Sequence, residues 1–571
     1  MSDFLWEKSY PPGVKWEIDI EQKPVYALLD EAVKKWPNNN AIDFMDKKIT
    51  YAELDGMVNR AAKGFRELGV KEGVHVGLYL PNTPHYIVCF FGIQKAGGTV
   101  VNYSPLDAER ELRHKIEDSH TDIMVTLDLE VLYPNIAKML GSTRLKKMVV
   151  GCIKEVLPFP KSLLYPLVKG KEIASVPKDE SHITFKQLLD NDGKIEAASV
   201  DNPSEKVAVL QYTGGTTGLP KGAMLTHTNL IAACQQLRTM QQDDDPIMFD
   251  GQEIILAVLP LFHIYALTVI MNFGIAGGSE IILHPKFELD AVMKDITKKK
   301  PTVFPGVPTM YMAIANHPEI DKFDLSSLKF CASGGAPLPV EVQDHFQRVT
   351  GCLLLEGWGM TETSPSGTST PRVGERVPGA AGVPLPGIEI RILGVDDKTK
   401  EMPTGEIGEI TIKGPNIMKG YWNKPEVTAE SFIDGFFLTG DTGFMDERGF
   451  MHIVDRTKDM ITSGGFNVYP RIIEEAIFEH PYVEEVTVVG IPDDYRGEAA
   501  KAFVKLTPDG EEFELEELRE YLKDKLGKHE LPAAVEFRPE LPKTLVGKLS
   551  KKELVEEEKL KYEERKKAEA S

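Results

Sequence analysis

The sequence predicts an α/β fold, and three observations support this fold class. Apolar strand-like runs alternate with amphipathic helical patterns as far as about residue 350, which favours largely parallel sheets. From about 379 to 454 short strands alternate with glycine turns and indicate a small β-rich unit. An α+β segment follows Asp455. At roughly 150 residues a domain, a chain of 571 residues has room for about four folding units.

Individual elements can be placed from their periodicity. Residues 51–68 have the spacing of an amphipathic helix, and residues 74–80 form an apolar run typical of a mostly buried strand. Residues 86–95 are helix-like and end at Ala96-Gly97-Gly98. Within the β-rich unit, residues 387–391 begin with a glycine turn and continue as a strand. The last stretch, 551–571, is rich in Lys, Glu and Ala and predicts a solvated helix or tail.

Composition narrows the class of protein. The hydrophobic content of 42% and charged content of 27% are ordinary for a soluble globular protein. A net charge of −21 argues against nucleic acid as a partner, because nucleic-acid binding needs a basic surface. The five cysteines are scattered and form no C-x-x-C pair, so we expect a reducing compartment. The N-terminus has no apolar signal core, and no apolar run reaches the ~18 residues of a membrane span. A cytoplasmic location is therefore expected.

One segment, 144–178, departs from this acidic background. It has eight basic and two acidic residues, a local charge of +6, around Val-Leu-Pro-Phe-Pro and Leu-Leu-Tyr-Pro-Leu-Val. Two interpretations stay open: a surface insertion packed on its own domain, or peripheral contact with an anionic membrane. The prolines preclude one continuous amphipathic helix.

A glycine-rich loop carries most of the functional signal. Residues 213–221 read Thr-Gly-Gly-Thr-Thr-Gly-Leu-Pro-Lys and follow the apolar, strand-like run 207–210. Glycines let consecutive amides point at one anion, and the Thr hydroxyls and Lys221 add donors and charge. A bare glycine cluster would predict only a turn. With three Thr and a Lys inside nine residues, the loop predicts a polyphosphate site.

Neither common nucleotide motif fits this loop. A Walker A loop needs Lys directly after Gly and then Ser or Thr, but Leu219 and Pro220 precede Lys221, and Gly222 follows it. The G-x-G-x-x-G pattern fails because Gly214 and Gly215 are adjacent. The ligand for any magnesium ion must therefore come from elsewhere in the chain.

Further motifs follow the loop in a fixed order. They are Leu259-Pro-Leu-Phe-His-Ile-Tyr-Ala266, Ser333-Gly-Gly-Ala-Pro-Leu338, Glu356-Gly-Trp-Gly-Met-Thr-Glu362, Thr439-Gly-Asp441, Asp455-Arg-Thr-Lys-Asp459, Gly464-Gly-Phe-Asn467, and Pro542-Lys-Thr544 through Gly547-Lys548. In this order and spacing the chain resembles the AMP-forming adenylate enzymes, the superfamily of acyl-CoA synthetases, peptide-synthetase adenylation domains and beetle luciferases. The resemblance extends from Thr50 to Lys548, and is strongest to medium- and long-chain fatty acyl-CoA synthetases.

This resemblance implies an architecture and a reaction. The architecture is a large N-terminal domain, 1–454, of two α/β subdomains plus a small β-barrel at about 379–454. A hinge at 455–459 would join it to a small mobile α+β C-terminal domain, 460–571. In the reaction a carboxylic acid attacks the α-phosphate of ATP, giving acyl-AMP and pyrophosphate, and coenzyme A then takes the acyl group. Mg²⁺ is the implied cofactor, and ATP and CoA are co-substrates.

The resemblance also assigns roles at the nucleotide. The loop would clamp the β- and γ-phosphates through Thr213, Gly214, Gly215, Thr216, Thr217, Gly218 and Lys221. Glu362 is the expected magnesium ligand and Thr361 the hydrogen-bond partner of the α-phosphate. Trp358, where most relatives have Tyr, would present a flat face to adenine, with Gly334, Gly335 and Ala336 on the other side of the base. Asp441 and Arg456 would bind the ribose.

Four further residues receive roles in acyl transfer. His263 is expected near the carboxyl end of the acid, although beside Phe262 it also suits a core histidine. Lys548 would bridge the carboxylate and the α-phosphate. Lys458 occupies the hinge position, where the small domain pivots and withdraws Lys548. Gly465 would line the pantetheine tunnel.

The acid itself is predicted from two positions. Acetate-type members close the acyl pocket with a Trp where this chain has Gly359, so an open pocket and a longer chain are expected. Residues 263–267 contain no carboxylate to hold a substrate ammonium, which favours an apolar acid, fatty or aryl. Two alternatives stay open: an adenylating enzyme with a carrier protein as acceptor, and a fatty-acid-binding or uptake protein that has lost catalysis. A homodimer also stays open.

Overall fold

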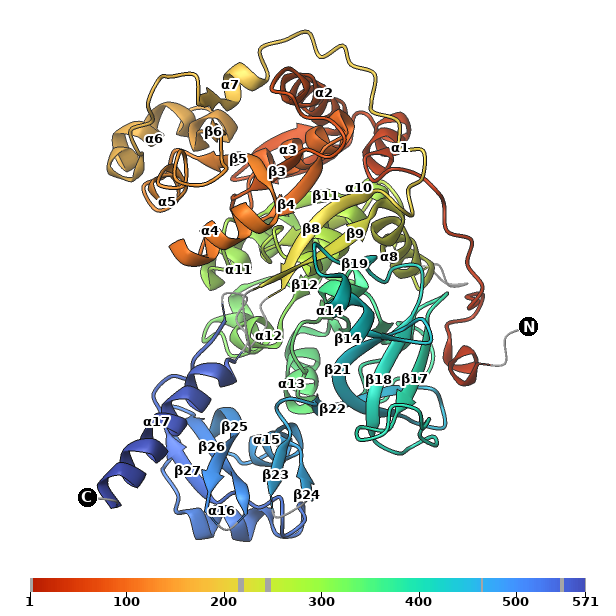
Figure 1. Cartoon of the computed structure of the whole chain (residues 1–571), viewed down its shortest axis with the longest axis vertical. Helices are drawn as coiled ribbons and strands as arrows, with labels where there is room; N and C mark the ends of the chain where they lie inside the picture. Colours follow the sequence, from red (N-terminus) through yellow and green to blue (C-terminus); the bar gives the residue numbers. More distant parts are fainter. Residues whose placement is uncertain are drawn as a thin grey trace.

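Two large sheets, an antiparallel sheet and a small C-terminal sheet make up the protein (Figure 1). The computed structural model describes residues 4–213, 220–241, 248–463, 466–494, 496–544 and 549–569. Figure 1 shows the small sheet and its helices at one end of the long axis and the two large sheets toward the other.

The nine-stranded sheet carries two of the predicted motifs at the ends of its strands. Six of its strands, β1, β11, β10, β12, β13 and β14, run parallel, as the βα alternation predicts. In spatial order its strands are β16 (Val383–Pro384), β15 (Thr368–Ser369), β14 (Leu353–Trp358), β13 (Phe330–Ser333), β12 (Val303–Gly306), β10 (Ile254–Ala257), β11 (Glu280–Leu283), β1 (Asn40–Phe44) and β2 (Lys47–Thr50).

The eight-stranded sheet carries the glycine-rich loop. Its strands are β19 (Gly420–Tyr421), β9 (Lys221–Thr226), β8 (Val207–Thr213), β4 (Thr99–Asn102), β3 (His75–Leu78), β5 (Thr121–Leu127), β6 (Lys147–Gly151) and β7 (His182–Thr184). From β8 to β7 the neighbours are parallel, but β9 is antiparallel to β8 and Thr213 pairs with Lys221. The loop therefore joins two strands of a hairpin, whereas a Walker loop joins a strand to a helix.

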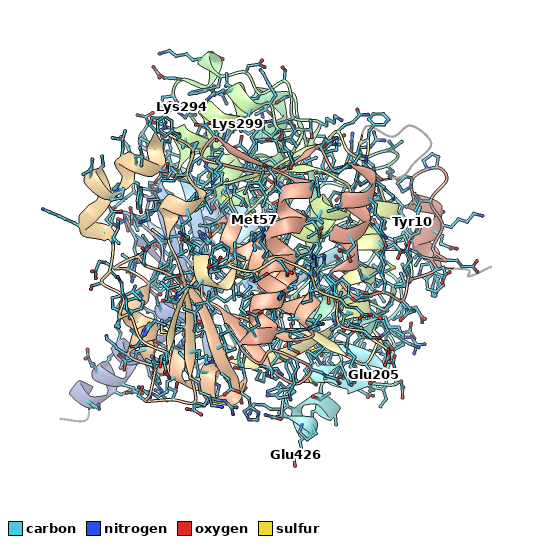
Figure 2. The ribbon with its side chains drawn as sticks, turned by 90° about the horizontal axis from the view of Figure 1, so that it is seen from above. Tyr10, Met57, Glu205, Lys294, Lys299 and Glu426 are labelled. Carbon is cyan, nitrogen blue, oxygen red and sulfur yellow. The ribbon has the colours of Figure 1, made fainter. Side chains whose placement is uncertain are left out.

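Helices cover both large sheets, and local sequence signals account for their ends. α2 begins after Thr50, whose side chain and that of Glu53 form a capping box, and α3 ends at Gly97, with φ of +93°. These two helices and β3 confirm the predictions for 51–68, 86–95 and 74–80; Met57 marks α2 in Figure 2. The helices of this region are α1 (Ala27–Lys35), α2 (Tyr51–Glu67), α3 (Pro84–Ala96), α4 (Glu109–Asp118), α5 (Tyr133–Ala137), α6 (Lys161–Lys169), α7 (Phe185–Leu188), α8 (His227–Thr239), α9 (Ile264–Ala266), α10 (Phe273–Ala276), α11 (Leu289–Lys299), α12 (Pro308–Ala315) and α13 (Val340–Thr350).

The segment predicted to be a small β-barrel forms a five-stranded antiparallel sheet. Its strands are β17 (Glu389–Leu393), β18 (Gly408–Lys413), β20 (Phe432–Ile433), β21 (Phe436–Met445) and β22 (Met451–Arg456), with α14 (Pro425–Glu430) before β20. The N-terminal segment packs on this region: Tyr10, labelled in Figure 2, donates its hydroxyl to the Pro384 carbonyl at 2.7 Å.

The C-terminal region has hydrophobic clusters of its own. The largest described cluster ends at Met451, and the next begins at Ile461. Its elements are β23 (Ile461–Ser463), β24 (Phe466–Val468), α15 (Pro470–Phe478), β25 (Val483–Asp493), β26 (Gly497–Leu506), α16 (Leu515–Leu522), β27 (Ala534–Phe537) and α17 (Lys551–Glu569). α17 confirms the predicted final helix. It is not simply solvated, because Leu554 is fully buried against Val489 and Phe503.

The basic segment 144–178 contains β6, the strand next to the β7 edge of the eight-stranded sheet. After β6 it forms a short 3₁₀ turn (Ile153–Val156), then α6, then a second turn (Gly170–Glu172), so it is interrupted as its prolines predict. In the part of the chain that the structure describes, no helix is both long and apolar enough to cross a membrane.

Candidate active site

Strand register brings the predicted motifs together at one edge of the nine-stranded sheet. Ser333 at the end of β13 pairs in parallel with Glu356 in β14. The glycines after Ser333 and the Gly-Trp-Gly turn after Glu356 therefore leave the sheet side by side. β10 ends at Ala257 on the same sheet and leads into the 259–266 motif. This carboxyl edge is where open α/β sheets bind ligands.

At one end of the site a lysine, a tyrosine and a carboxylate meet. β19 pairs with β9, which places Tyr421 beside Ala223 and close to Lys221. The Lys221 Nζ lies 4.4 Å from the centroid of the Tyr421 ring. The Tyr421 hydroxyl donates to Glu362 Oε1 at 2.7 Å, and burial followed by the Glu362 charge raises the pKa of Tyr421. The lysine of the loop and the proposed metal ligand are thus joined through one aromatic ring.

Sequence reasoning missed Tyr421. It lies in an ordinary Gly-Tyr-Trp stretch with no glycine-rich or charged pattern around it. Only the pairing of β19 with β9 brings it to Glu362, so no local signal predicts its position.

Part of the predicted clamp lies outside the described residues. This applies to Gly214, Gly215, Thr216, Thr217 and Gly218, and likewise to Gly465 and Lys548. At the base of the hairpin Thr213 is described, and its Oγ1 lies 3.5 Å from the Lys221 carbonyl oxygen.

At the other end of the site an indole and a guanidinium hold a buried carboxylate. The Trp358 Nε1 donates to Asp441 Oδ2 at 2.8 Å, and Arg456 Nε lies 3.2 Å from Asp441 Oδ1. Asp441 and Arg456 also face each other across β21 and β22. Burial raises the pKa of Asp441, and the Arg456 charge and the indole N–H oppose this shift. The three residues predicted for adenine and ribose are therefore one connected group.

The Ser333–Leu338 motif has a tightly packed backbone. A Cβ at Gly334 would lie 3.1 Å from the Tyr265 ring, and Gly335 has φ of +80°, so both positions favour glycine. Ala336 follows them and is half-buried. The turn is fixed at its end, because the Leu338 N–H donates to Glu356 Oε1 at 3.1 Å; burial raises the pKa of Glu356 to about 7.

The loop that carries His263 is held by the other large sheet. Asn82 donates to the Leu259 carbonyl and accepts from the Leu261 N–H, both at 2.8 Å. Gln211, at the end of β8, donates to the Phe262 carbonyl at 2.9 Å. His263 is half-buried and caps α9, accepting the Tyr265 N–H at Nδ1 at 3.3 Å.

Thr361 and Glu362 begin a short 3₁₀ turn (Thr361–Thr363) after β14. Thr361 is half-buried, and Glu362 is buried with its backbone carbonyl accepting from Met418 N at 2.8 Å. Both side chains therefore start from a fixed backbone.

Gly359 has a steric reason to be glycine. A Cβ at this position would lie 1.4 Å from the Pro365 carbonyl oxygen, closer than any non-bonded contact allows. The absence of a side chain is therefore required by the backbone of the following turn. The open acyl pocket stays a prediction. Gly359 no longer supports it independently, because the backbone alone explains the glycine.

The predicted hinge contains a carboxylate shared by both regions. Asp455 Oδ1 accepts the Arg456 N–H at 2.7 Å, and Oδ2 accepts the N–H of Arg471 at the start of α15 at 2.9 Å. Burial, and then the charge of Arg456, lower the pKa of Lys458. The boundaries at 454 and 460 stay a prediction.

The chemistry of the site fits magnesium bound together with phosphates. Mg²⁺ usually takes one or two protein carboxylates and completes its shell with water and substrate phosphates. Among the described residues no group of three or more His, Cys, Asp or Glu side chains could form a complete protein cage. Glu362 is a single buried carboxylate close to the lysine of the phosphate loop, which suits such a shared site.

The site has a cation, Lys221, at one end and a two-oxygen acceptor, Asp441, at the other, with the carboxyl edge of a parallel sheet between them. This arrangement is typical of a nucleotide-dependent enzyme. Two family models match the chain: "AMP-binding enzyme" over residues 29–422 and "AMP-binding enzyme C-terminal domain" over 472–548. The chain belongs to the AMP-binding enzyme family, as its motifs predict.

Individual relatives match over nearly the whole chain. A long-chain-fatty-acid–CoA ligase of Bacillus subtilis is 41% identical, covering 97% of this chain and 98% of the relative. A feruloyl-CoA synthase of Amycolatopsis is 35% identical, covering 91% of this chain and 96% of the relative. The crystal structure of ATP-bound MatB from Rhodopseudomonas palustris is similar, with a TM-score of 0.80 and 31% identity. The match covers 94% of this chain and 99% of MatB. Together with the family models these matches confirm the predicted fold class, a large N-terminal region followed by a small C-terminal domain.

Proposed function

We propose that this protein is an AMP-forming fatty acyl-CoA ligase. It activates a medium- or long-chain fatty acid with ATP to acyl-AMP and pyrophosphate, and then transfers the acyl group to coenzyme A. The observation that carries the proposal is the 41% identity, over 97% of the chain, to a long-chain-fatty-acid–CoA ligase, in a chain that has Glu362, Asp441 and the loop lysine Lys221.

The phosphate end is proposed to neutralise charge in the first half-reaction. A carboxylate and a triphosphate are both anions, so their approach is favoured only where positive charge offsets the repulsion. Lys221 supplies one such charge, and Glu362 would hold Mg²⁺, which supplies further Lewis acidity when bound. Tyr421 donates to Glu362 and so orients the carboxylate.

The nucleoside end is proposed to position AMP. Each carboxylate oxygen has two lone pairs, so Asp441 can accept ribose hydroxyls while it remains bonded to Trp358 and Arg456. The Trp358 ring offers a face for adenine, and Gly334, Gly335 and Ala336 form the opposite wall. Thr361 is assigned to the α-phosphate and His263 to the acid carboxylate.

Lys548 is proposed to act only in acyl-AMP formation. Lys458 is proposed to lie at the pivot of the C-terminal domain, whose rotation then brings Gly465 to the pantetheine arm of CoA. A test follows from this division. Lys548→Ala should abolish acyl-AMP formation and leave the reaction of CoA with supplied acyl-AMP intact. Equal loss in both half-reactions would refute the role.

The proposed function is tested with a pool of acids. The protein is incubated with ATP, Mg²⁺, CoA and short, medium, long and aryl acids, and thioesters are identified by mass. We expect AMP, pyrophosphate and a fatty acyl-CoA in equal amounts. No product and no pyrophosphate exchange with any acid would reject the enzyme and favour a binding protein.

A second candidate is an aryl or other apolar acid as substrate, with CoA or a carrier protein as acceptor. The 35% identity to a feruloyl-CoA synthase favours keeping it. The same pool decides between the two, because a dominant aryl thioester, or exchange without CoA consumption, would replace the fatty acid proposal.

A further inference from the structure

Apolar side chains gather on the outer surface at α6. Among the described residues twelve large hydrophobic side chains are exposed, and five of them, Phe159, Leu163, Leu164, Leu167 and Val168, lie within ten positions. Phe159, Leu167 and Val168 are 80%, 82% and 75% exposed. A soluble protein normally scatters such residues singly, and a contiguous patch marks an interaction surface.

The helix is attached through Tyr165 and Lys161 and presents its leucines and Val168 to solvent. Tyr165 packs against the core, and Lys161 Nζ donates to Asp46 Oδ2 at 2.8 Å. Asp46 also lies 3.5 Å from Lys299, which is labelled in Figure 2. The exposed leucines and Val168 follow i, i+4 spacing on the other face. Surface helices of globular proteins have the opposite arrangement, with the apolar stripe toward the core.

Lysines lie along the same segment. Lys154, Lys169, Lys171 and Lys178 are exposed, and so is Lys161, which is paired with Asp46 on the attached side. Lys169 is paired with Glu172 at 2.6 Å, but the segment 144–178 still has a net charge of +6 in a chain of −21. Exposed apolar side chains within a basic segment complement the interface of an anionic bilayer, where apolar groups enter the acyl boundary and lysines reach the headgroups.

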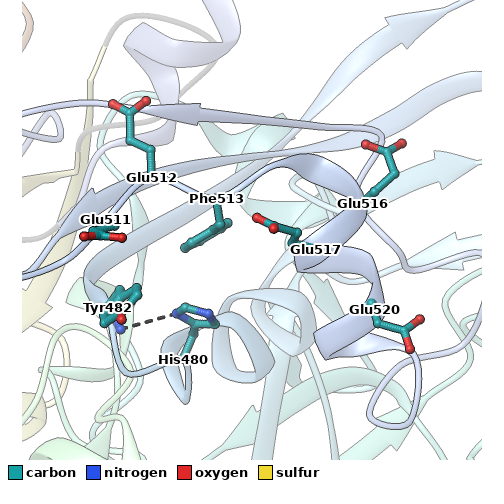
Figure 3. Close-up of a pocket in the computed structure, with 8 residues that line it drawn as sticks. All are labelled: His480, Tyr482, Glu511, Glu512, Phe513, Glu516, Glu517 and Glu520. Atoms are coloured by element: carbon teal, nitrogen blue, oxygen red, sulfur yellow. Dashed lines mark hydrogen bonds between the residues drawn. The ribbon is translucent and has the colours of Figure 1, made fainter.

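The opposite end of the molecule has the opposite charge. A pocket of about 670 Å³ in the C-terminal domain is lined by Glu511, Glu512, Glu516, Glu517 and Glu520 together with His480, Tyr482 and Phe513, which Figure 3 draws. Figure 1 places α6 on the outer edge of the molecule near β6 and α5, and this domain at the other end of the long axis. An anionic surface would attract the first region and repel the second, which selects one orientation.

We propose that the outward face of α6, together with Phe159, is a docking surface for an anionic phospholipid bilayer. The proposal extends the proposed function, because a long-chain acid partitions into bilayers and docking would place the enzyme where its substrate collects. A second copy of the chain is the competing occupant of an apolar face, and the test includes it.

The experiment measures cosedimentation of the full-length protein with vesicles of phosphatidylcholine alone or mixed with an equal part of phosphatidylglycerol. We expect binding to the mixed vesicles that weakens as salt is raised. Phe159→Ser with Leu167→Ser should lower partitioning about tenfold or more. Lys154→Gln with Lys171→Gln should weaken binding to the mixed vesicles and reduce the effect of salt.

A matched pair of single variants controls for general loss of surface hydrophobicity. Leu167 on α6 and Leu560 on α17 are both exposed leucines, and only Leu167→Ser should weaken vesicle binding. Unchanged binding by the Phe159 and Leu167 double variant, or no binding by the unmodified protein, would overturn the proposal. A dimer that the double variant separates would assign the face to a second copy.

These measurements are independent of the proposed function, since cosedimentation needs no acid, ATP or CoA. In the absence of vesicles the double variant should activate water-soluble octanoate as well as the unmodified protein does. If neither protein makes a thioester but the vesicle result holds, the function fails and the docking surface stands. Loss of soluble activity in the double variant alone would instead assign α6 a role within the fold and overturn the proposal.

Discussion

The two ends of the nucleotide site are built differently. At the nucleoside end Asp441 is already bonded on both oxygens, to Trp358 and Arg456, so its direction is set before any ligand binds. At the phosphate end the Tyr421 hydroxyl donates to Glu362 Oε1, and the Lys221 Nζ lies over the Tyr421 ring. With the proposed roles, the difference means that binding and reaction would be separated: the rigid group would recognise the nucleoside, and the charges of Lys221 and Glu362 would serve the chemistry.

The largest effect is expected where the two ends are joined, at Gly359. Gly359→Ala places a methyl group 1.4 Å from the Pro365 carbonyl oxygen, so the backbone between Trp358 and Glu362 must move. We expect both ATP binding and turnover to be lost, and the free energy of unfolding to fall by about 1–3 kcal/mol. Thermal melts and ATP titration measure this.

The control for that change is Gly56→Ala. Gly56 is exposed in α2 and a Cβ there meets nothing within 4 Å, so stability should rise by up to ~1 kcal/mol. Normal activity in Gly359→Ala would contradict the steric requirement.

Glu362→Gln should impair catalysis at the phosphate end and leave nucleoside binding intact. The amide keeps the shape and accepts from Tyr421, but it loses the charge that would hold magnesium. We expect kcat for acyl-AMP formation to fall about 10²–10³-fold with the KM for ATP changed little. Pyrophosphate exchange at increasing Mg²⁺ measures this. A variant whose only defect is a raised KM would place Glu362 at recognition and erase the contrast between the two ends.

Asp441→Asn should weaken ATP binding at the nucleoside end and leave the phosphate end intact. The amide leaves Arg456 without its charged partner and turns one acceptor into a donor that faces the Trp358 N–H. We expect the KM for ATP to rise about 10–100-fold, the value of a charged hydrogen bond, with a smaller change in kcat. Steady-state kinetics at saturating acid measure both constants. A fall in kcat alone would reject the assignment to binding.

Trp358→Phe tests whether the indole N–H positions Asp441. Phenylalanine retains an aromatic face and leaves Asp441 Oδ2 without its donor, so the KM for ATP should rise about tenfold. Trp358→Tyr is the comparison that keeps a polar ring. If Trp358→Phe binds ATP as the unmodified protein does, the bond contributes nothing to recognition.

Tyr421→Phe is expected to have the smallest effect. It removes only the hydroxyl that orients Glu362 and keeps the ring against Lys221, so kcat should fall about fivefold, near the value of one net hydrogen bond. The magnesium concentration for half-maximal rate should rise in parallel, which a purely structural role for Tyr421 would not cause.

Local signals predicted the parts of the fold that local forces determine. The helix after Thr50 follows from a capping box and an amphipathic stripe, and the end of α3 follows from a glycine with positive φ. The basic segment 144–178 also forms no continuous helix, as its prolines predict: α6 begins directly after Pro160, although Pro166 lies within it. In each case the cause lies within a few residues of the effect.

Long-range pairing could not be predicted in the same way. The motifs placed Trp358 and Asp441 in one site, but the bond between them spans 83 residues and depends on β21 meeting β14. Tyr421 reaches Glu362 only through strand pairing with β9. Gly359 shows the reverse case: the sequence-based interpretation rested on its missing side chain, which the backbone of the next turn requires independently of any pocket.

The amides that hold the 259–263 loop have a consequence for dissecting the chain. Asn82 and Gln211 belong to the eight-stranded region, yet they satisfy backbone groups of a loop that follows a strand of the nine-stranded sheet. A fragment with only one of the two sheets would lose these three hydrogen bonds and would expose apolar side chains of the core cluster that the two sheets share. We therefore expect the two layers to fold as one unit, and only fragments that keep both should express as native protein.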